Sequence, residues 1–311
     1  METWLATQTT CGPHEIDDEK RMIHLQFQKQ VAHLLPINDP HKLNDVDLLY
    51  RFLIARNWDI ALAEKMLTDH VAWRMENDID GLLRETFPDD IMENYSGGFM
   101  GVDIHGNPLY FERPDPKGIA YLLGKYERKV LVRWHLLKME IRRRRAKLMG
   151  KDRTTSVLDL SLVGVGILAN TTVLGFLKEI AHIDQANFPE CMRYLVIINA
   201  PWTFSTVWAV IQKFLDERVQ KKINIFKGAE GIAKFAALDQ VPKAFGGTAG
   251  EWCTMGKEIG DARHALSLAD LRRSSHSEVV GGDDGCGGGD DDDFHSVCSN
   301  EEELQERMKD V

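Results

Sequence analysis

The chain has 311 residues, 43% of them hydrophobic, so it can bury a substantial core in one large domain or in one domain plus a small one. Its formal net charge of -10 equals the charge of the segment after residue 276, which holds 12 acidic and 2 basic residues, so the rest of the chain is neutral. No run reaches the roughly 18 apolar residues of a membrane-spanning helix, and the polar N-terminus predicts no signal peptide. Five scattered cysteines without CxxC spacing argue against a disulfide scaffold and for a reducing, cytoplasmic location.

Three helices are predicted in the first 80 residues. The first covers residues 17–35 and ends at Pro36, within an N-terminal extension of residues 1–44. The other two cover residues 45–56 and 60–76, and both have an apolar stripe at helical spacing. We expect these two helices to pair as a small module, residues 45–80, packed on the main domain.

Residues 90–250 are predicted to fold as one α/β domain with largely parallel strands. Strands and helices alternate along this segment, which is typical of that class. The expected strands cover residues 108–112, 156–160, 194–199 and 223–226. The expected helices cover residues 120–149, 167–180 and 202–215.

The helix predicted at residues 202–215 follows a buried strand and is apolar almost all round. Such a helix requires an apolar environment on more than one side, either a core or lipid. We expect it to act as a gate over an apolar cavity and to be able to dip into a bilayer. The residues expected to form the gate and to line the cavity are Phe204, Val207, Trp208, Ile211 and Phe214.

Two further segments of the chain are strongly charged. The low-complexity segment 274–311 is rich in glycine and aspartate and is predicted to be disordered. The run Arg142–Arg145 lies late in the long predicted helix, where a solvated helix end is the simplest interpretation. Contact with anionic lipid headgroups and nuclear targeting stay open for this run, whereas interleaved aromatic and basic residues, which would indicate nucleic-acid binding, do not accompany it.

Several motifs run through the chain in a consistent order. They are Arg51-Phe52-Leu53-x-Ala55-Arg56, Gly106-x-Pro108-x-Tyr110, Pro189-Glu190-x-Met192, Ile197-Ile198-Asn199-Ala200-Pro201-x-x-Phe204, Lys213-Phe214-Leu215-Asp216, Lys222-Ile223 and Val241-Pro242-x-x-Phe245-Gly246-Gly247. Over about residues 45 to 248 the chain thereby resembles the CRAL-TRIO lipid-binding family. Within it, the chain is most similar to the secretory-pathway phosphatidylinositol/phosphatidylcholine transfer proteins. The resemblance implies a mostly parallel sheet that forms the floor of an apolar lipid cavity, gated by a hydrophobic helix, with a small helical N-terminal module.

The resemblance also implies a site for an inositol headgroup. Inositol presents hydroxyl donors and a phosphate, which suit a carboxylate and a cation. The residues carried over are Glu190 for the ring, Lys222 for the phosphate, Arg56 near the headgroup, and Asp216, for which capping or bracing the loop after the gate helix is an alternative role. The chain departs from the family at Glu217, Val219 and Asn57, so we expect altered affinity for inositol lipids.

A second set of residues matches the family's choline-lipid positions. The hydroxyls of Thr154 and Ser156 are expected to hold the phosphate, and the rings of Phe99 and Tyr110 the ammonium. The resemblance therefore implies phosphatidylinositol as the principal ligand and phosphatidylcholine as a possible exchange partner. It also implies reversible contact with a membrane surface such as the Golgi, the endosome or the plasma membrane, and presentation of inositol lipid to a lipid kinase as a further role.

Two alternatives stay open at this point. A CRAL-TRIO carrier of tocopherol, a retinoid or a sterol-like ligand shares the fold, but such a ligand has no use for Glu190 and Lys222. The sequence Gly164-x-Gly166-x-x-Ala169 is a passable dinucleotide fingerprint and makes an NAD-dependent dehydrogenase a distant alternative. The segment between the preceding strand and the glycines is longer than the tight turn that binds a phosphate. The fingerprint also requires an acidic residue at the end of a second strand about 20 positions on, but Asp184 is expected in a loop. We expect a monomer without catalysis, cofactor or metal.

Overall fold

The computed structural model describes residues 17–34, 46–95, 97–164, 170–202, 204–251, 253–257 and 259–260. Residues Met1–Ile259 form one unit and Gly260–Val311 a second one, of which only Gly260 is described. The predicted disordered segment 274–311 lies outside the described residues. In the part of the chain that is described, no helix is long and apolar enough to cross a membrane.

Three helices, α2 (Asp18–Val31), α3 (Val46–Ala55) and α4 (Ile60–Glu76), form a helical bundle with one apolar cluster. The Asp59 carboxylate accepts a hydrogen bond from the Leu62 backbone N–H at 2.9 Å and so caps α4. The break between α3 and α4 falls where predicted, because Asn57 and Trp58 adopt left-handed φ angles of 53° and 66°. Since Phe27 and Val31 of α2 belong to the same cluster, the helical part begins at α2 and not at residue 45. The short helix η1 (Ala32–Leu34) continues α2.

The main part is built on a six-stranded sheet of order β5-β4-β3-β2-β1-β6. Neighbouring strands from β2 to β5 run parallel, as predicted, and β1 pairs antiparallel with β2 and with β6. The strands are β1 (Gly98–Val102), β2 (Pro108–Glu112), β3 (Thr154–Asp159), β4 (Met192–Ile198), β5 (Ile223–Ile225) and β6 (Cys253–Thr254).

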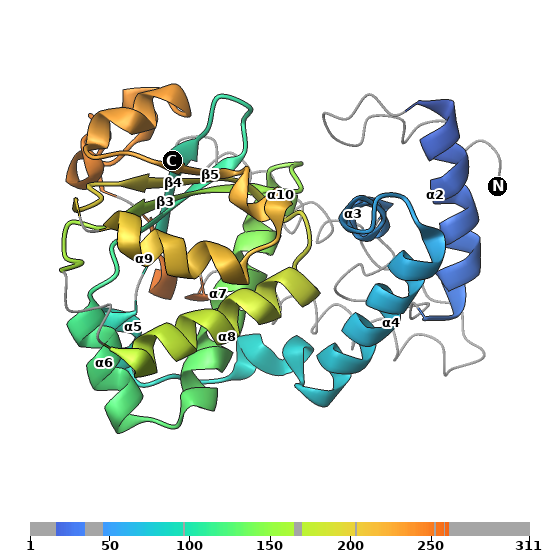
Figure 1. The fold of residues 1–311 in the computed structure, drawn as a ribbon, viewed down its shortest axis with the longest axis horizontal. Helices are drawn as coiled ribbons and strands as arrows, with labels where there is room; N and C mark the ends of the chain where they lie inside the picture. The colour runs from blue at the N-terminus through green and yellow to red at the C-terminus, as the bar shows by residue number, and fades with distance from the viewer. Residues whose placement is uncertain are drawn as a thin grey trace, which may run out of the picture. The chain divides into compact units, whose positions relative to one another are not determined.

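Each face of the sheet has its own covering layer (Figure 1). On one face, Phe111, Val157 and Val196 pack with the short helices η5 (Ala229–Lys234) and η7 (Lys243–Phe245), next to η6 (Leu238–Gln240). On the other face, strand side chains such as Ile197 pack against α9 (Phe204–Ile211). The layer on this second face also contains α7 (Arg128–Leu148) and α8 (Thr171–Asn187). The described residues also form the helices η2 (Ile79–Arg84), α5 (Asp89–Asn94), α6 (Pro116–Lys125), η4 (Gln212–Phe214) and α10 (Glu217–Gln220).

Two helix predictions were wrong in their bounds. The single helix predicted at residues 120–149 is two helices, α6 and α7, because Tyr126 adopts an extended conformation (φ -114°, ψ 151°) that ends α6. The helix predicted at residues 167–180 begins at Thr171, after the Asn170 side chain that caps it, and continues to Asn187. Asp184 therefore lies in α8 and not in a loop.

Candidate functional site

A cavity of about 430 Å³ lies between the sheet and the helices α7, α8 and α9. This volume is in the range of small-molecule and cofactor pockets. A row of side chains crosses the cavity floor, because parallel strands in register present paired residues to the same face. Tyr110, Ser156, Leu195 and Ile223 are successive partners from β2 to β5, and all four line the cavity. Most other lining side chains are apolar, so the space between sheet and helices is a cavity with an apolar wall.

Helix α9 forms part of the wall, as the gate hypothesis requires. Phe204, Trp208 and Ile211 line the cavity and also pack against the sheet. Phe214 does not line it; its ring lies 5.1 Å from the Lys178 ammonium instead. The side chain of Val207 lies outside the described part of the chain. The first three residues thus share the face of α9 that borders the cavity, whereas Phe214 lies in the 3-10 helix η4 that follows.

The two principal residues predicted for the inositol headgroup meet at one edge of the cavity. The Lys222 Nζ atom lies 2.6 Å from Glu190 Oε2, although 32 positions separate the residues in sequence. Arg153 approaches the same carboxylate at 3.6 Å. Glu190 has a left-handed φ of 58°, an uncommon and strained conformation for a non-glycine residue; such conformations cluster at functional sites. The arrangement supplies both a hydrogen-bond acceptor and a cation, and both residues line the cavity.

Arg56 and Asp216 also line the cavity, but the Asp216 side chain does not cap α10. Its carboxylate makes no capping hydrogen bond at the start of α10; its backbone N–H donates to Gln185 Oε1 at 2.6 Å. The brace between the gate loop and α8 is therefore a backbone contact. Sequence reasoning missed Arg218 nearby, which lines the cavity and donates hydrogen bonds to the Ile54 carbonyl and to Asn57 Oδ1.

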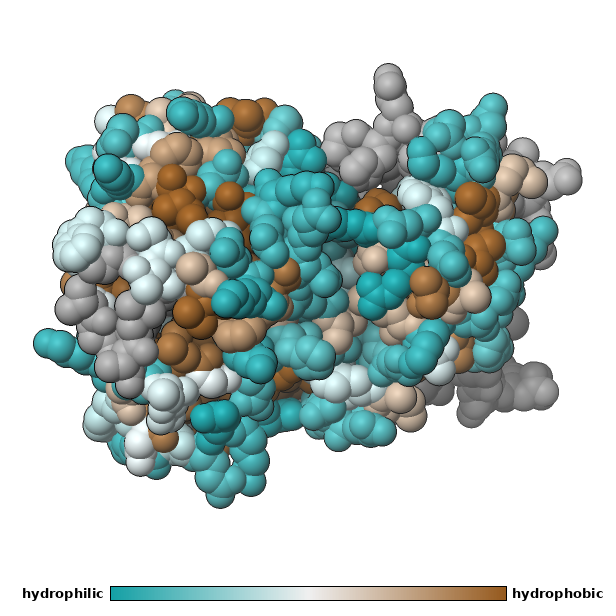
Figure 2. All heavy atoms as spheres, viewed as in Figure 1, coloured by the Kyte–Doolittle hydropathy of each residue, from teal (hydrophilic) through white to brown (hydrophobic). Residues whose placement is uncertain are grey.

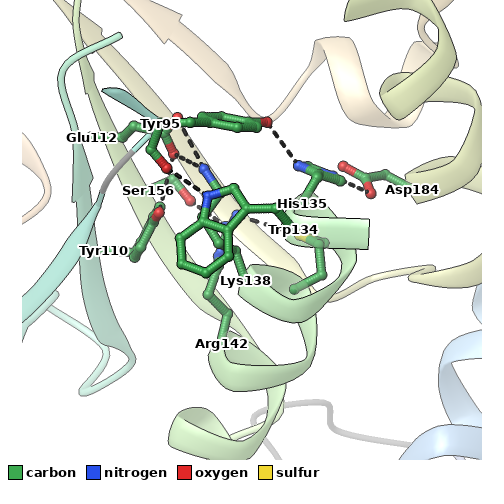
Figure 3. Close-up of polar contacts among 10 residues, drawn as sticks. Tyr95, Tyr110, Glu112, Trp134, His135, Lys138, Arg142, Ser156 and Asp184 are labelled. Carbon is green, nitrogen blue, oxygen red and sulfur yellow. Dashed lines mark hydrogen bonds and ion pairs between the residues drawn. The ribbon is translucent and has the colours of Figure 1, made fainter. Parts of the chain in front are cut away.

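A second group of polar side chains lies inside the cavity wall, centred on Lys138 of α7 (Figure 3). Lys138 is only 3% exposed, and its ammonium lies 3.2 Å from Glu112 Oε2 and 3.4 Å from the centre of the Tyr95 ring. Burial lowers the pKa of Lys138, although Glu112 opposes the effect. Tyr110 also donates to Glu112 Oε2, at 3.1 Å. Burial raises the pKa of the Tyr110 hydroxyl well above its usual value, which keeps this hydroxyl protonated.

His135 links the same group to α8. Its Nδ1 atom lies 3.1 Å from the Tyr95 hydroxyl, and its Nε2 atom lies 2.9 Å from Asp184 Oδ1. His135, Lys138 and Arg142 follow one another at helical spacing and share one face of α7. That spacing is the signal from which the interior polar face could have been predicted; sequence reasoning instead considered only the arginine run.

Arg142 contradicts the interpretation of the arginine run as a solvated helix end. Its guanidinium lines the cavity, donates a hydrogen bond of 2.5 Å to Ser156 Oγ, and lies 4.7 Å from the Tyr110 ring. The neighbouring Arg143 pairs with Glu140 at 3.0 Å and is largely buried. The end of α7 packs against the sheet, so these side chains point inward.

The four residues predicted for a choline headgroup divide into two groups. Thr154, Ser156 and Tyr110 line the cavity. Phe99 does not: it is buried, with its ring centre 5.2 Å from that of Tyr110. The glycine sequence considered for a dinucleotide lies, from residue 165 onward, outside the described residues. Among the residues that are described, no three His, Cys, Asp or Glu side chains form a cluster suited to a metal ion.

Comparisons with known proteins define the class of this fold and site. Residues 92–247 match the model of the CRAL/TRIO domain, and residues 14–69 match that of the CRAL/TRIO N-terminal domain. The chain therefore belongs to the CRAL-TRIO family, as the motifs indicated. The N-terminal match includes α2, in agreement with its packing in the helical bundle.

Individual relatives are similar over most of this chain. The phosphatidylinositol/phosphatidylcholine transfer proteins SFH4 and SFH7 of Arabidopsis thaliana are each 30% identical, over 74% and 67% of the chain. Protein real-time of Anopheles gambiae is 31% identical over 72% of it. The chain spans only 38%, 40% and 34% of these relatives, so it covers less than half of their length. The crystal structure of Sfh5 superposes with a TM-score of 0.58 at 18% identity, covering 71% of this chain and 85% of Sfh5.

Proposed function

We propose that this chain binds phosphatidylinositol in the cavity and transfers it between membranes. The observation that supports this proposal best is the Glu190–Lys222 pair at the edge of an apolar cavity. The names of two relatives, which are phosphatidylinositol/phosphatidylcholine transfer proteins, agree with it. The headgroup would lie at the pair, and the acyl chains would lie against α8, α9 and the sheet.

The energetics of lipid transfer explain why such a cavity is needed. Two acyl chains contain about 30 methylene groups, and exposing each to water costs about 0.8 kcal/mol, in total on the order of 20 to 25 kcal/mol. A transfer protein offsets this cost only if it offers the chains an equally apolar space. The face of α9 that carries Phe204, Trp208 and Ile211 provides one wall of that space.

The headgroup chemistry distinguishes an inositol lipid from other ligands of the family. Glu190 accepts hydrogen bonds from ring hydroxyls, and Lys222 neutralises the phosphate. The two side chains neutralise each other, so a headgroup with both donors and a negative charge replaces the contacts that it breaks. A tocopherol, a neutral retinoid or a sterol-like ligand has no negative charge, so its binding would not offset the loss of this ion pair.

Presentation of the bound lipid to a kinase would use the same pair, so it stays part of this proposal. Both roles require the protein to touch a bilayer. Trp202, at the start of the segment that leads into α9, is 87% exposed. Apolar side chains also reach the surface over β4, β5 and α9 (Figure 2). These features favour this face as the membrane contact.

A transfer assay with matched variants tests the headgroup assignment. We expect Glu190→Ala and Lys222→Ala each to lower the transfer of phosphatidylinositol between vesicles about tenfold, the effect of losing roughly 1.4 kcal/mol of binding energy. The matched control is Lys221→Ala, because Lys221 is the exposed neighbour of Lys222 and pairs only with Glu217 in the described residues. If the two site variants transfer phosphatidylinositol as well as the control, the assignment is wrong.

Mass spectrometry of the lipid that copurifies with the protein tests the ligand directly. We expect phosphatidylinositol in the purified wild-type protein and less of it in the two site variants. Recovery of only a non-phospholipid ligand from the wild-type protein would overturn the proposal.

A further inference from the structure

In the part of the chain that the structure describes, the guanidinium of Arg142 lies in the cavity wall without a carboxylate partner. Among the described residues, its contacts are Ser156 Oγ at 2.5 Å, Met139 Sδ at 3.5 Å and the Tyr110 ring at 4.7 Å. Its Nε atom is buried and has no hydrogen-bond acceptor. Other cations of the interior do have carboxylates: Lys138 pairs with Glu112 at 3.2 Å, and Arg143 pairs with Glu140 at 3.0 Å.

A cation in an apolar wall is unfavourable unless an anion compensates it. Because the described residues provide no such anion for Arg142, the compensating charge is expected from the occupant of the cavity. The position inside the cavity fits a lipid head. Ser156 is the third residue of β3; Leu158, farther along the same strand, and Leu160, just after its end, also line the cavity. A head at Arg142 thus has an apolar path of about 13 Å beside it, at roughly 3.3 Å per strand residue.

The same region is unsuited to a choline ammonium. A quaternary ammonium binds to aromatic faces, and here the protein's own cations occupy those faces. Lys138 lies over Tyr95, Arg142 over Tyr110, and Arg145 over Phe99 at 5.8 Å. The two nearby carboxylates are engaged as well, Glu112 by Lys138 and Asp184 by His135.

We propose that Arg142, with the Ser156 hydroxyl beside it, binds the anionic head of a second lipid, a phosphate monoester or a carboxylate, and that this site rejects phosphocholine. Phosphatidic acid and a free fatty acid present these two heads. The inference rests on the proposed function in one respect, that the cavity holds lipid, but it does not depend on the inositol assignment. Because the second lipid would fill the same apolar space as phosphatidylinositol, the two compete.

Extraction of lipid from vesicles by the full chain tests the inference. The vesicles contain phosphatidic acid, phosphatidylcholine or phosphatidylinositol, with oleic acid in a separate arm, and the bound lipid is quantified by mass spectrometry. We expect the wild-type protein to take up phosphatidic acid or oleic acid at least tenfold better than phosphatidylcholine. Preference for phosphatidic acid identifies a phosphate head, and preference for oleic acid identifies a carboxylate head.

Variants at position 142 assign the effect to the guanidinium. Arg142→Gln is expected to lower the uptake of phosphatidic acid or oleic acid, relative to that of phosphatidylinositol, at least tenfold. Arg142→Lys is expected to restore most of this ratio, because the positive charge returns. The control is Arg128→Gln on the same helix, whose arginine pairs with Glu179 at 3.5 Å on the surface; it should leave the ratio unchanged. The restoring lysine variant separates lost charge from damaged folding.

Three results would overturn the inference. The first is uptake of phosphatidylcholine equal to that of phosphatidic acid and oleic acid. The second is an Arg142→Gln variant whose uptake ratio to phosphatidylinositol equals that of the wild-type protein. The third is the same ratio in Arg142→Lys as in Arg142→Gln. The outcome is separable from that of the proposed function. If the protein takes up no phosphatidylinositol but its uptake of phosphatidic acid or oleic acid depends on Arg142, only the inositol assignment is refuted. If it takes up phosphatidylinositol but the uptake of the other two lipids does not depend on Arg142, only this inference is refuted.

Discussion

Single residues at the edge of the cavity were largely predictable from the chain. Glu190 and Lys222 belong to two separate motifs, and the structure brings them within 2.6 Å. This follows from the topology: Glu190 precedes β4, Lys222 precedes β5, and the two strands are parallel neighbours. Their roles toward a ligand stay predictions, whereas their proximity is a property of the fold.

The direction of Arg142 was not predictable in the same way. Successive residues of an α-helix point about 100° apart, so a run of four arginines covers every side of the helix. Which of them faces the cavity depends on how α7 is rotated. Buried side chains such as Leu131, Trp134 and Ile141 fix that rotation, and their packing partners come from distant parts of the chain.

The pH dependence of stability is predicted to involve His70. This side chain is buried, with its Nδ1 atom 3.1 Å from Asn187 Oδ1 of α8. Burial, and then the charge of Arg74, lower the pKa of His70 to about 4. Because an unfolded histidine has a pKa near 6.5, the unfolded state takes up a proton below that pH that the folded state does not. Stability is therefore lost as the pH falls from about 6.5 toward 4.

Urea unfolding at pH 7.5 and at pH 5 measures this effect. The wild-type protein should lose about 2 kcal/mol more than His70→Gln between the two pH values, since each pKa unit corresponds to about 1.4 kcal/mol. The same loss in both proteins would show that His70 titrates normally in the folded state.

At the scale of helices and strands, the central elements were predicted and the short ones were not. The strands β2 to β5 have continuous apolar or β-branched runs, which identify them. The strand β1 contains Gly98 and Gly101, and β6 has only two residues, so neither carries a recognisable pattern. The break between α6 and α7 was missed because the residues around Tyr126 are compatible with a helix; only their conformation in the fold separates the two helices.

The contact between α4 and α7 depends on a buried ion-pair group. The Glu140 carboxylate, 4% exposed, binds Arg74 Nη1 at 2.8 Å and Arg143 Nη2 at 3.0 Å. Burial raises the pKa of Glu140, but the charges of Arg143 and Arg74 outweigh this effect and lower it. The carboxylate is therefore ionised at neutral pH and compensates two buried cations.

Replacement of this carboxylate should destabilise the protein markedly. We expect Glu140→Gln to lower the free energy of unfolding by about 3 kcal/mol, because it removes the buried negative charge that Arg74 and Arg143 share. Chemical denaturation measures the change, and Glu127→Gln, at an exposed position just before α7, is the control with little expected effect. A loss in Glu140→Gln no larger than in the control would mean that the group does not stabilise the α4–α7 contact.

At the scale of the whole molecule, the decisive property is that one face of the sheet borders a packed core and the other borders a cavity. On the core face, side chains such as Val157 and Val196 are fully enclosed by the layer of η5 and η7. On the cavity face, Leu195 and Ile223 line open space instead. A sheet with this asymmetry can border a cavity on one face without losing its own core on the other.

Membrane contact is predicted to depend on Trp202. A tryptophan with 87% exposure is favourable at a membrane–water interface, where its ring contacts both apolar and polar groups. We expect Trp202→Ala to reduce binding to phospholipid vesicles several-fold in a flotation assay. Met75→Ala is the control, because Met75 is 78% exposed on α4, within the helical bundle. Equal binding of both variants would place the membrane contact elsewhere.

The sequence by itself determined the class of the fold and the positions of its central strands along the chain, and it singled out the two charges at the cavity edge, because these follow from local patterns and short motifs. Only the tertiary structure decided that Arg142 and Lys138 point into the cavity, that Phe99 and Phe214 do not line it, and that α2 belongs to the helical bundle. The physical reason is the same in each case. Hydrophobic patterning fixes which side of an element is buried, but the rotation of a helix and the partners of a buried charge depend on contacts between residues far apart in sequence.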